Sequence, residues 1–214
     1  MKNLISSKFE RLKRNFGHKM TKSFEFFFDY TSPTAYIGDY AGRAVAARTG
    51  AEMIYRPMFL GGVMQATGNQ PPGMVAAKGK YMSKDVPRCA ARYSLKFAFN
   101  PAFPLKTLPI LRASLGLESE DLAKFRDACW SHIWGADGPK NLGEPDEIKA
   151  MCANIGLDGD RILAMGGDDA LKAKLIANTE EAVARGAFGA PTYFVGEEMF
   201  FGHDRLDYVE ELLG

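Results

Sequence analysis

The chain of 214 residues carries 27 lysines and arginines against 26 acidic residues, and its net charge of +1 gives no electrostatic basis for binding nucleic acid. No apolar run approaches the roughly 18 residues that a membrane-spanning helix needs, so we expect no membrane contact. The chain has three widely spaced cysteines, Cys89, Cys129 and Cys152, and no Cys-x-x-Cys pair. This pattern argues against a disulfide framework, a zinc site and a dithiol redox centre. Isolated thiols also favour a reducing, cytoplasmic location.

Residues 1–22 form a basic segment that differs from the rest of the chain, with Glu10 as its one acid. The segment contains no apolar core of signal-peptide length, so we expect no secretion. It is a short basic helix, a weak organelle-targeting sequence, or a tail translated from an upstream start codon, with Met20 as the true start. We expect a poorly ordered tail and place the start of the folded chain at residue 23.

The stretch 24–34 is the point around which the chain is organised. Four phenylalanines between 24 and 28 predict a strand that is buried on both faces of a sheet. Ser32-Pro33 then gives a hydroxyl N-cap followed by proline at the first position of a helix over 33–48. Ser32 therefore lies at a helix N-terminus, where backbone amides and the helix dipole stabilise an anion. The alternative is that Ser32 is only a cap.

A second strand is predicted over 51–57, parallel to the first because a helix separates the two. From Gly61-Gly62 to Gly73 the chain is rich in glycine, proline, asparagine and glutamine, which predicts an irregular binding segment. From about 83 to 166 the signals are helical, with helices that begin at Asp85, Ser119 and Pro145 and with the first reaching Phe97. We therefore expect a mainly helical insertion over 61–166.

The last part of the chain returns to alternating helix and strand. A helix is predicted from Asp168 to Gly186, then strands at 191–195 and 199–201 joined by a tight turn, and then a helix capped by Asp204. The order of elements is β-α-β, helical insertion, α-β-β-α. The predicted fold class is therefore α/β, a thioredoxin-like domain made of 23–60 and 167–214 and interrupted by helices.

Thioredoxin-like proteins place their reactive group at the N-terminus of the helix after the first strand, opposite a cis-proline before the third. Ser32 occupies the first position, and Ala190-Pro191-Thr192 is similar to the second. Because Ser32-Pro33-Thr34-Ala35 contains no sulfur, a thiol must come from outside the chain, and glutathione is the obvious candidate.

The sequence from about 24 to 213 resembles the kappa-class glutathione transferases and the bacterial 2-hydroxychromene-2-carboxylate isomerases. Five motifs in order carry the resemblance: Asp29-x-x-Ser32-Pro33, Gly68-Asn69-Gln70-Pro71-Pro72-Gly73, Lys78-Gly79-x-Tyr81-Met82, Gly186-Ala187-Phe188-Gly189-Ala190-Pro191-Thr192 and Phe201-Gly202-His203-Asp204-Arg205. Each motif is weak alone, and the five together are strong because they occur in order on a chain whose elements already predict this fold.

The resemblance implies roles for the residues at these positions. Ser32 would be catalytic, donating its hydroxyl to the glutathione sulfur and favouring the thiolate. The other residues implied to bind glutathione are Thr34, Asn69, Lys78, Ala190, Pro191, His203 and Asp204. Among them, the Ala190 backbone would pair with the cysteinyl backbone, and Lys78 would oppose a carboxylate. Asp204 would pair with the γ-glutamyl ammonium beside His203.

Each of these residues also has a structural interpretation. Asn69 is explained by a turn, Lys78 by solvated surface and Asp204 by an N-cap. His132 is a packed helix residue rather than a ligand. Aromatic residues of the helical insertion (Tyr93, Trp130 and Trp134) are more often core than pocket.

We expect a glutathione-dependent isomerase of an aromatic 2-oxo acid that acts through a reversible thiolate adduct. The alternatives are a kappa-type transferase that conjugates electrophiles and a thioredoxin-fold protein that binds glutathione or another ligand without turnover. The resemblance also implies a homodimer.

Overall fold

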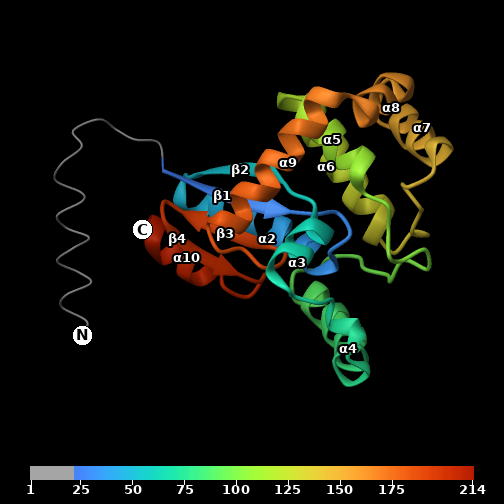
Figure 1. Ribbon diagram of the computed structural model, residues 1–214. Helices are drawn as coiled ribbons and strands as arrows, with labels where there is room; N and C mark the ends of the chain where they lie inside the picture. Colours follow the sequence, from blue (N-terminus) through green and yellow to red (C-terminus); the bar gives the residue numbers. More distant parts are fainter. Residues whose placement is uncertain (1–21) are drawn as a thin grey trace, which may run out of the picture.

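The computed structural model describes residues 22–214, so the predictions made for the basic tail lie almost wholly outside the described residues. A four-stranded sheet in the order β2-β1-β3-β4 occupies the centre of the fold (Figure 1). Its strands are β1 (Ser23–Phe28), β2 (Glu52–Pro57), β3 (Thr192–Val195) and β4 (Glu198–Phe201). β2 is parallel to β1, whereas β3 is antiparallel to both β1 and β4. The phenylalanines of β1 are buried on both faces, as the apolar run predicts.

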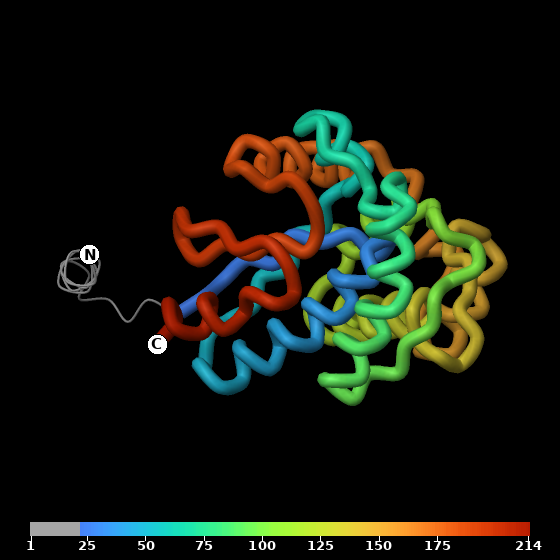
Figure 2. Tube along the Cα trace, turned by 90° about the horizontal axis from the view of Figure 1, so that it is seen from below, coloured from blue at the N-terminus to red at the C-terminus, as the bar shows by residue number. Residues whose placement is uncertain are grey.

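The helices of the described part are α2 (Pro33–Thr49), α3 (Leu60–Thr67), the 3-10 helix η1 (Pro72–Met74), α4 (Ala76–Arg92), α5 (Leu108–Gly116), α6 (Ser119–Trp134), α7 (Pro145–Asn154), α8 (Gly159–Gly167), α9 (Asp169–Ala184) and α10 (Leu206–Leu213). Helices α2 and α10 lie on one side of β1 and α9 lies on the other (Figure 2). Helices α5 to α8 gather beyond one end of the sheet, and α4 projects from the body (Figure 1). The predicted α/β thioredoxin fold with interposed helices is confirmed.

The prediction of an irregular segment from Gly61 was wrong, because residues 60–67 form helix α3. The two glycines are packing positions and not helix breakers, since a methyl group at Gly61 would lie 2.8 Å from the Phe59 ring. Leu60 and Val63 anchor the helix in the core. The irregular segment begins only at Gly68, which ends α3 in the left-handed conformation with φ 71°.

Two predicted helix starts were also wrong. Asp85 lies inside α4, which begins at Ala76 and ends at Arg92 instead of reaching Phe97. Asp204 does not cap α10, because its carboxylate accepts a hydrogen bond from Nη1 of Arg205 at 2.7 Å and the helix begins only at Leu206. The expected cap of α6, Ser119, is its first residue, and the cap position is one residue earlier.

The helical insertion packs directly on the turn that follows β1. Trp130 and Trp134 of α6 are buried, which confirms their interpretation as core residues. Nε1 of Trp134 donates to the Tyr30 carbonyl at 2.8 Å, and the Trp130 ring meets that of Tyr30 at 4.7 Å. His132 bonds to the Ala128 carbonyl of its own helix, consistent with a packed helix residue. The insertion therefore supports the segment that carries Ser32.

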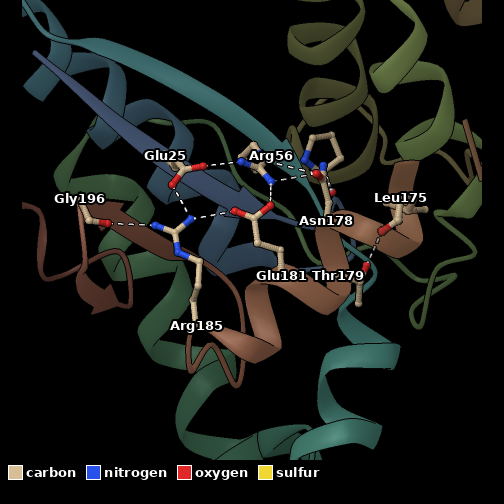
Figure 3. A network of polar contacts seen from close by, with 9 residues as sticks. Glu25, Arg56, Leu175, Asn178, Thr179, Glu181, Arg185 and Gly196 are labelled. Atoms are coloured by element: carbon tan, nitrogen blue, oxygen red, sulfur yellow. Dashed lines mark hydrogen bonds and ion pairs between the residues drawn. The ribbon is translucent and has the colours of Figure 1, made fainter. Parts of the chain in front are cut away.

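A charged network fixes α9 to the sheet (Figure 3). Glu25 of β1 pairs with both Arg56 of β2 and Arg185, which follows α9. Glu181 of α9 closes the network by pairing with the same two arginines. Both guanidinium groups also lie over the Phe27 ring, at 4.8 and 5.7 Å from its centroid. The network thus fixes the start of the loop that leads to Ala190.

Candidate functional site

Ser32 occupies the N-terminus of α2 with only 3% of its surface exposed. Its Oγ accepts the backbone N–H of Ala35 at 3.1 Å, so Ser32 is an N-cap, as expected. The same oxygen lies 3.2 Å from the carbonyl oxygen of Ala190, to which it donates, and 3.0 Å from Oγ1 of Thr34. Thr34 also donates to the Ala190 carbonyl, at 3.2 Å. The structure therefore brings together the two segments that sequence placed on opposite sides of one site.

The loop around Ala190 is held in shape from both sides. The Ala190–Pro191 peptide bond is cis. The Pro191 carbonyl accepts the N–H of Gly202 at 2.9 Å, and Thr192 Oγ1 donates to the Gly189 carbonyl at 2.8 Å. Pro191 also packs on α2, since a methyl group at Gly38 would lie 3.1 Å from its Cγ. Within residues 22–214 the Ala190 N–H has no hydrogen-bond partner.

Asn69 connects the end of α3 to the same loop. Its Nδ2 donates to the Phe188 carbonyl at 2.7 Å, two residues before Ala190. Its Oδ1 accepts the N–H of Gln70 at 2.8 Å, which is the turn role that sequence also allowed. Both ends of the amide therefore hold the site together in this structure.

The buried carboxylate of Asp29 joins the Ser32 turn to two helices that are distant in sequence. Oδ1 accepts the N–H of Thr31 at 3.0 Å and the hydroxyl of Thr107 at 2.6 Å, and Oδ2 accepts the N–H of Leu60 at 2.9 Å. Burial raises the pKa of Asp29, while these three donors act in the opposite direction. Asp29 thus positions Ser32 relative to the start of α3, a role that the sequence analysis did not assign.

His203 and Asp204 lie at the start of α10, opposite helix α4. Burial lowers the pKa of His203, whereas the charges of Asp204 and of Asp85 from α4 favour its protonated form. Asp85 therefore belongs to this cluster, although sequence suggested only a cap. It lies seven residues, or two helical turns, after Lys78, so the two share one face of α4. That spacing was the signal that could have found Asp85.

Lys78 itself is exposed in the first turns of α4 and makes no hydrogen bond or ion pair with any residue of the described chain. It is joined to the cluster around Asp85 only by sharing a helix face. Its predicted contact with glutathione stays a prediction.

The chemistry that this site supports is stabilisation of an anion without a protein thiol. Cys129 and Cys152 are buried in the core, and burial raises the pKa of the half-buried Cys89 thiol, which keeps it protonated.

Residues 22–214 contain no group of three histidine, cysteine or acidic side chains that could hold a metal. None of the helices in this described part of the chain is both long and apolar enough to span a membrane.

Comparisons with known proteins agree with the fold. A family model described as DSBA-like thioredoxin domain matches residues 24–214. The 2-hydroxychromene-2-carboxylate isomerase of Sphingobium xenophagum is 32% identical over 198 residues, which cover 91% of this chain and 99% of the relative. Glutathione S-transferase kappa 1 of Rattus norvegicus is 27% identical over 205 residues, which cover 89% and 90%. A solved 2-hydroxychromene-2-carboxylate isomerase shares the fold with a TM-score of 0.78 at 24% identity, over 90% of this chain and 94% of that one.

Proposed function

Because the chain belongs to the family of DSBA-like thioredoxin domains, and because its relatives include 2-hydroxychromene-2-carboxylate isomerases and kappa-class glutathione transferases, we propose that it is a glutathione-dependent isomerase of an aromatic 2-oxo acid. The observation that carries the proposal is that the Ser32 hydroxyl, at the N-terminus of α2, donates to the Ala190 carbonyl in a site that contains no sulfur atom. Bound glutathione would supply the thiolate that adds reversibly to the conjugated substrate, so that a double bond becomes a single bond and can rotate.

The residues present fit a tripeptide. The free N–H of Ala190 and its carbonyl lie beside Ser32 and offer a donor and an acceptor to a peptide backbone in the manner of an added strand. Pro191 and Asn69 would hold this loop in place. These contacts support the proposal that the backbone of glutathione would pair with Ala190 beside Ser32.

Ser32 and Thr34 both donate a hydroxyl hydrogen bond to the Ala190 carbonyl. Each hydroxyl carries one proton, and both are within 3.2 Å of the Ala190 oxygen. The Ser32 hydroxyl can therefore turn toward a sulfur atom while Thr34 continues to satisfy Ala190. A hydroxyl donor at the positive end of the α2 dipole favours a thiolate over a thiol.

The two ends of glutathione would meet opposite charges. Asp204, with Asp85 of α4 nearby, would attract the γ-glutamyl ammonium, and a neutral His203 would add a hydrogen bond. Lys78 would oppose a carboxylate. We also propose a homodimer in the cytoplasm, as the resemblance implies.

The alternative functions remain conjugation of an electrophile, which the kappa-class relatives support, and ligand binding without turnover. One experiment separates the three. The protein is incubated with 2-hydroxychromene-2-carboxylate and glutathione and followed by absorbance and mass spectrometry. A changed spectrum at unchanged substrate mass supports the isomerase, and a mass gain of one glutathione supports the transferase. Glutathione binding with no change in this substrate would support the binding protein.

A further inference from the structure

A cavity separate from the candidate site is lined by residues of helices α3, α5 and α9, which Figure 1 labels. Its volume of about 460 Å³ falls in the range of small-molecule sites. Apolar side chains from all three helices and from Phe59 make up most of the lining, among them Leu108, Leu175 and Ile176. None of the residues proposed to bind glutathione contributes to it.

Two cationic side chains, Arg112 of α5 and Lys172 of α9, interrupt this apolar lining. Nη1 of Arg112 donates to the Gly166 carbonyl at 2.9 Å, and its Nε is buried with no hydrogen-bond partner among residues 22–214. Neither cation forms an ion pair with any residue that the structure describes. A guanidinium partly removed from water without a counter-charge is unfavourable, and an anion from outside the chain would compensate it.

The two cations lie at the same end of the cavity. Gly166 is at the end of α8, directly before α9, so its hydrogen bond holds Arg112 near the first turn of α9. Lys172 belongs to that first turn. Glu180, the one acid in the lining, comes eight residues later, about 12 Å further along the helix at a rise of 1.5 Å per residue. The cavity therefore has a cationic end, an apolar middle and an acidic far rim.

We propose that this cavity is a second ligand site for a small apolar monocarboxylate, an aromatic or medium-chain acid. The carboxylate would bind between Arg112 and Lys172, and the apolar body would pack between Phe59, Leu108 and Ile176. The acid at the far rim disfavours a second negative charge on the ligand, and the apolar middle disfavours a sugar or a nucleotide. The proposal does not depend on the function assigned to Ser32.

The test measures binding of 2-naphthoate by calorimetry and NMR, with uncharged 2-naphthamide as a probe of nearly the same shape. We expect saturable binding of naphthoate with a dissociation constant below about 1 mM, and at least about tenfold weaker binding of the amide. Saturating glutathione should leave the naphthoate affinity unchanged, since the two sites share no residue.

Three variants assign the site. Lys172→Met removes one cation from an exposed position and should weaken naphthoate about tenfold while leaving the amide unaffected. Lys174→Met, a change at an exposed lysine of α9 outside the lining, is the matched control and should have no effect. Ala66→Phe fills the cavity from the exposed face of α3 and should abolish binding of both probes.

Several results would overturn the proposal. These are no saturable naphthoate binding at about 5 mM, equal affinity for acid and amide, or naphthoate binding that survives Ala66→Phe. Competition between naphthoate and glutathione would place the probe in the Ser32 site instead. Sedimentation that shows a dimer dissociated by Ala66→Phe would mean that a second copy of the chain covers this face.

Discussion

Removal of the Ser32 hydroxyl gives the sharpest test of the proposed mechanism, because the structure assigns this one oxygen two separable tasks. As an N-cap it accepts the Ala35 N–H, and its loss in Ser32→Ala should lower the free energy of unfolding by about 1 kcal/mol. As the donor to a thiolate it makes a hydrogen bond to a charged group, with a contribution of about 1.5–3 kcal/mol. The predicted loss of turnover is therefore about 10- to 150-fold.

Ser32→Gly separates the two tasks. Glycine caps helices almost as well as serine, with a loss of only a few tenths of a kcal/mol, but it also lacks the hydroxyl. Both variants should lose turnover to a similar extent, whereas only Ser32→Ala should lose stability clearly. The Ala190 carbonyl keeps the Thr34 hydroxyl in both proteins, so no buried acceptor is left without a donor.

The assay combines steady-state turnover, urea unfolding and ultraviolet titration of the thiolate in the glutathione complex. The pKa of the bound thiol should rise in both variants, and the affinity for glutathione should change less than turnover does. Thr34→Val is the neighbouring control and should lower turnover by about tenfold or less. Unchanged turnover in folded Ser32→Ala and Ser32→Gly would refute the reasoning and leave Ser32 as a cap alone.

Four further predictions follow from the same contacts. Asp204→Asn should weaken glutathione binding by about 1–3 kcal/mol in calorimetry without moving the melting temperature, because Asp204 is exposed and caps no helix; equal affinity would contradict the assignment. Asp29→Asn should lower the free energy of unfolding by about 3 kcal/mol, and Thr107→Val should lower it by less because it removes only one of the three donors to the carboxylate. Equal losses would contradict the inference that Asp29 is held by all three donors. Burial lowers the pKa of His203, so as pH falls below about 6.5 the imidazole is protonated in the unfolded chain before it is protonated in the folded chain. Between pH 7.5 and 5.5, urea unfolding should therefore show a larger loss of stability for the wild type than for His203→Gln. A chain that starts at Met20 should keep its melting temperature and activity, and a large drop in either would show that the tail packs on the domain.

The sequence predicted the fold and the central contact of the site because their signals are local. An apolar run followed by Ser-Pro specifies a buried strand and a capped helix, and both are present around Ser32. The order of the remaining strands and helices is that of a thioredoxin-like domain, and this likeness places Ala190 opposite Ser32, where the structure has it.

The features that sequence missed depend on particular side-chain contacts, some with near neighbours and some with residues distant in the chain. The glycines at the start of α3 suggest a loop until the Phe59 ring is seen to pack on them. Asp29 carries no local sign that its donors come from residues 31, 60 and 107. Asp204 matches the sequence pattern of a helix N-cap, but its carboxylate accepts a hydrogen bond from the adjacent Arg205 instead. In each case a specific side-chain contact outweighs the general preference of the residue type.

The topology also determines when the site can form. The hydroxyl of Ser32 meets the Ala190 carbonyl across a sequence separation of 158 residues, and β1 obtains its second neighbour, β3, only from the end of the chain. During synthesis the phenylalanine-rich β1 therefore has an unpaired edge until the C-terminal quarter of the chain, which contains β3, has left the ribosome. Contacts of such long range form late and slowly, so chains that end before the last two strands should aggregate rather than accumulate as a folded fragment.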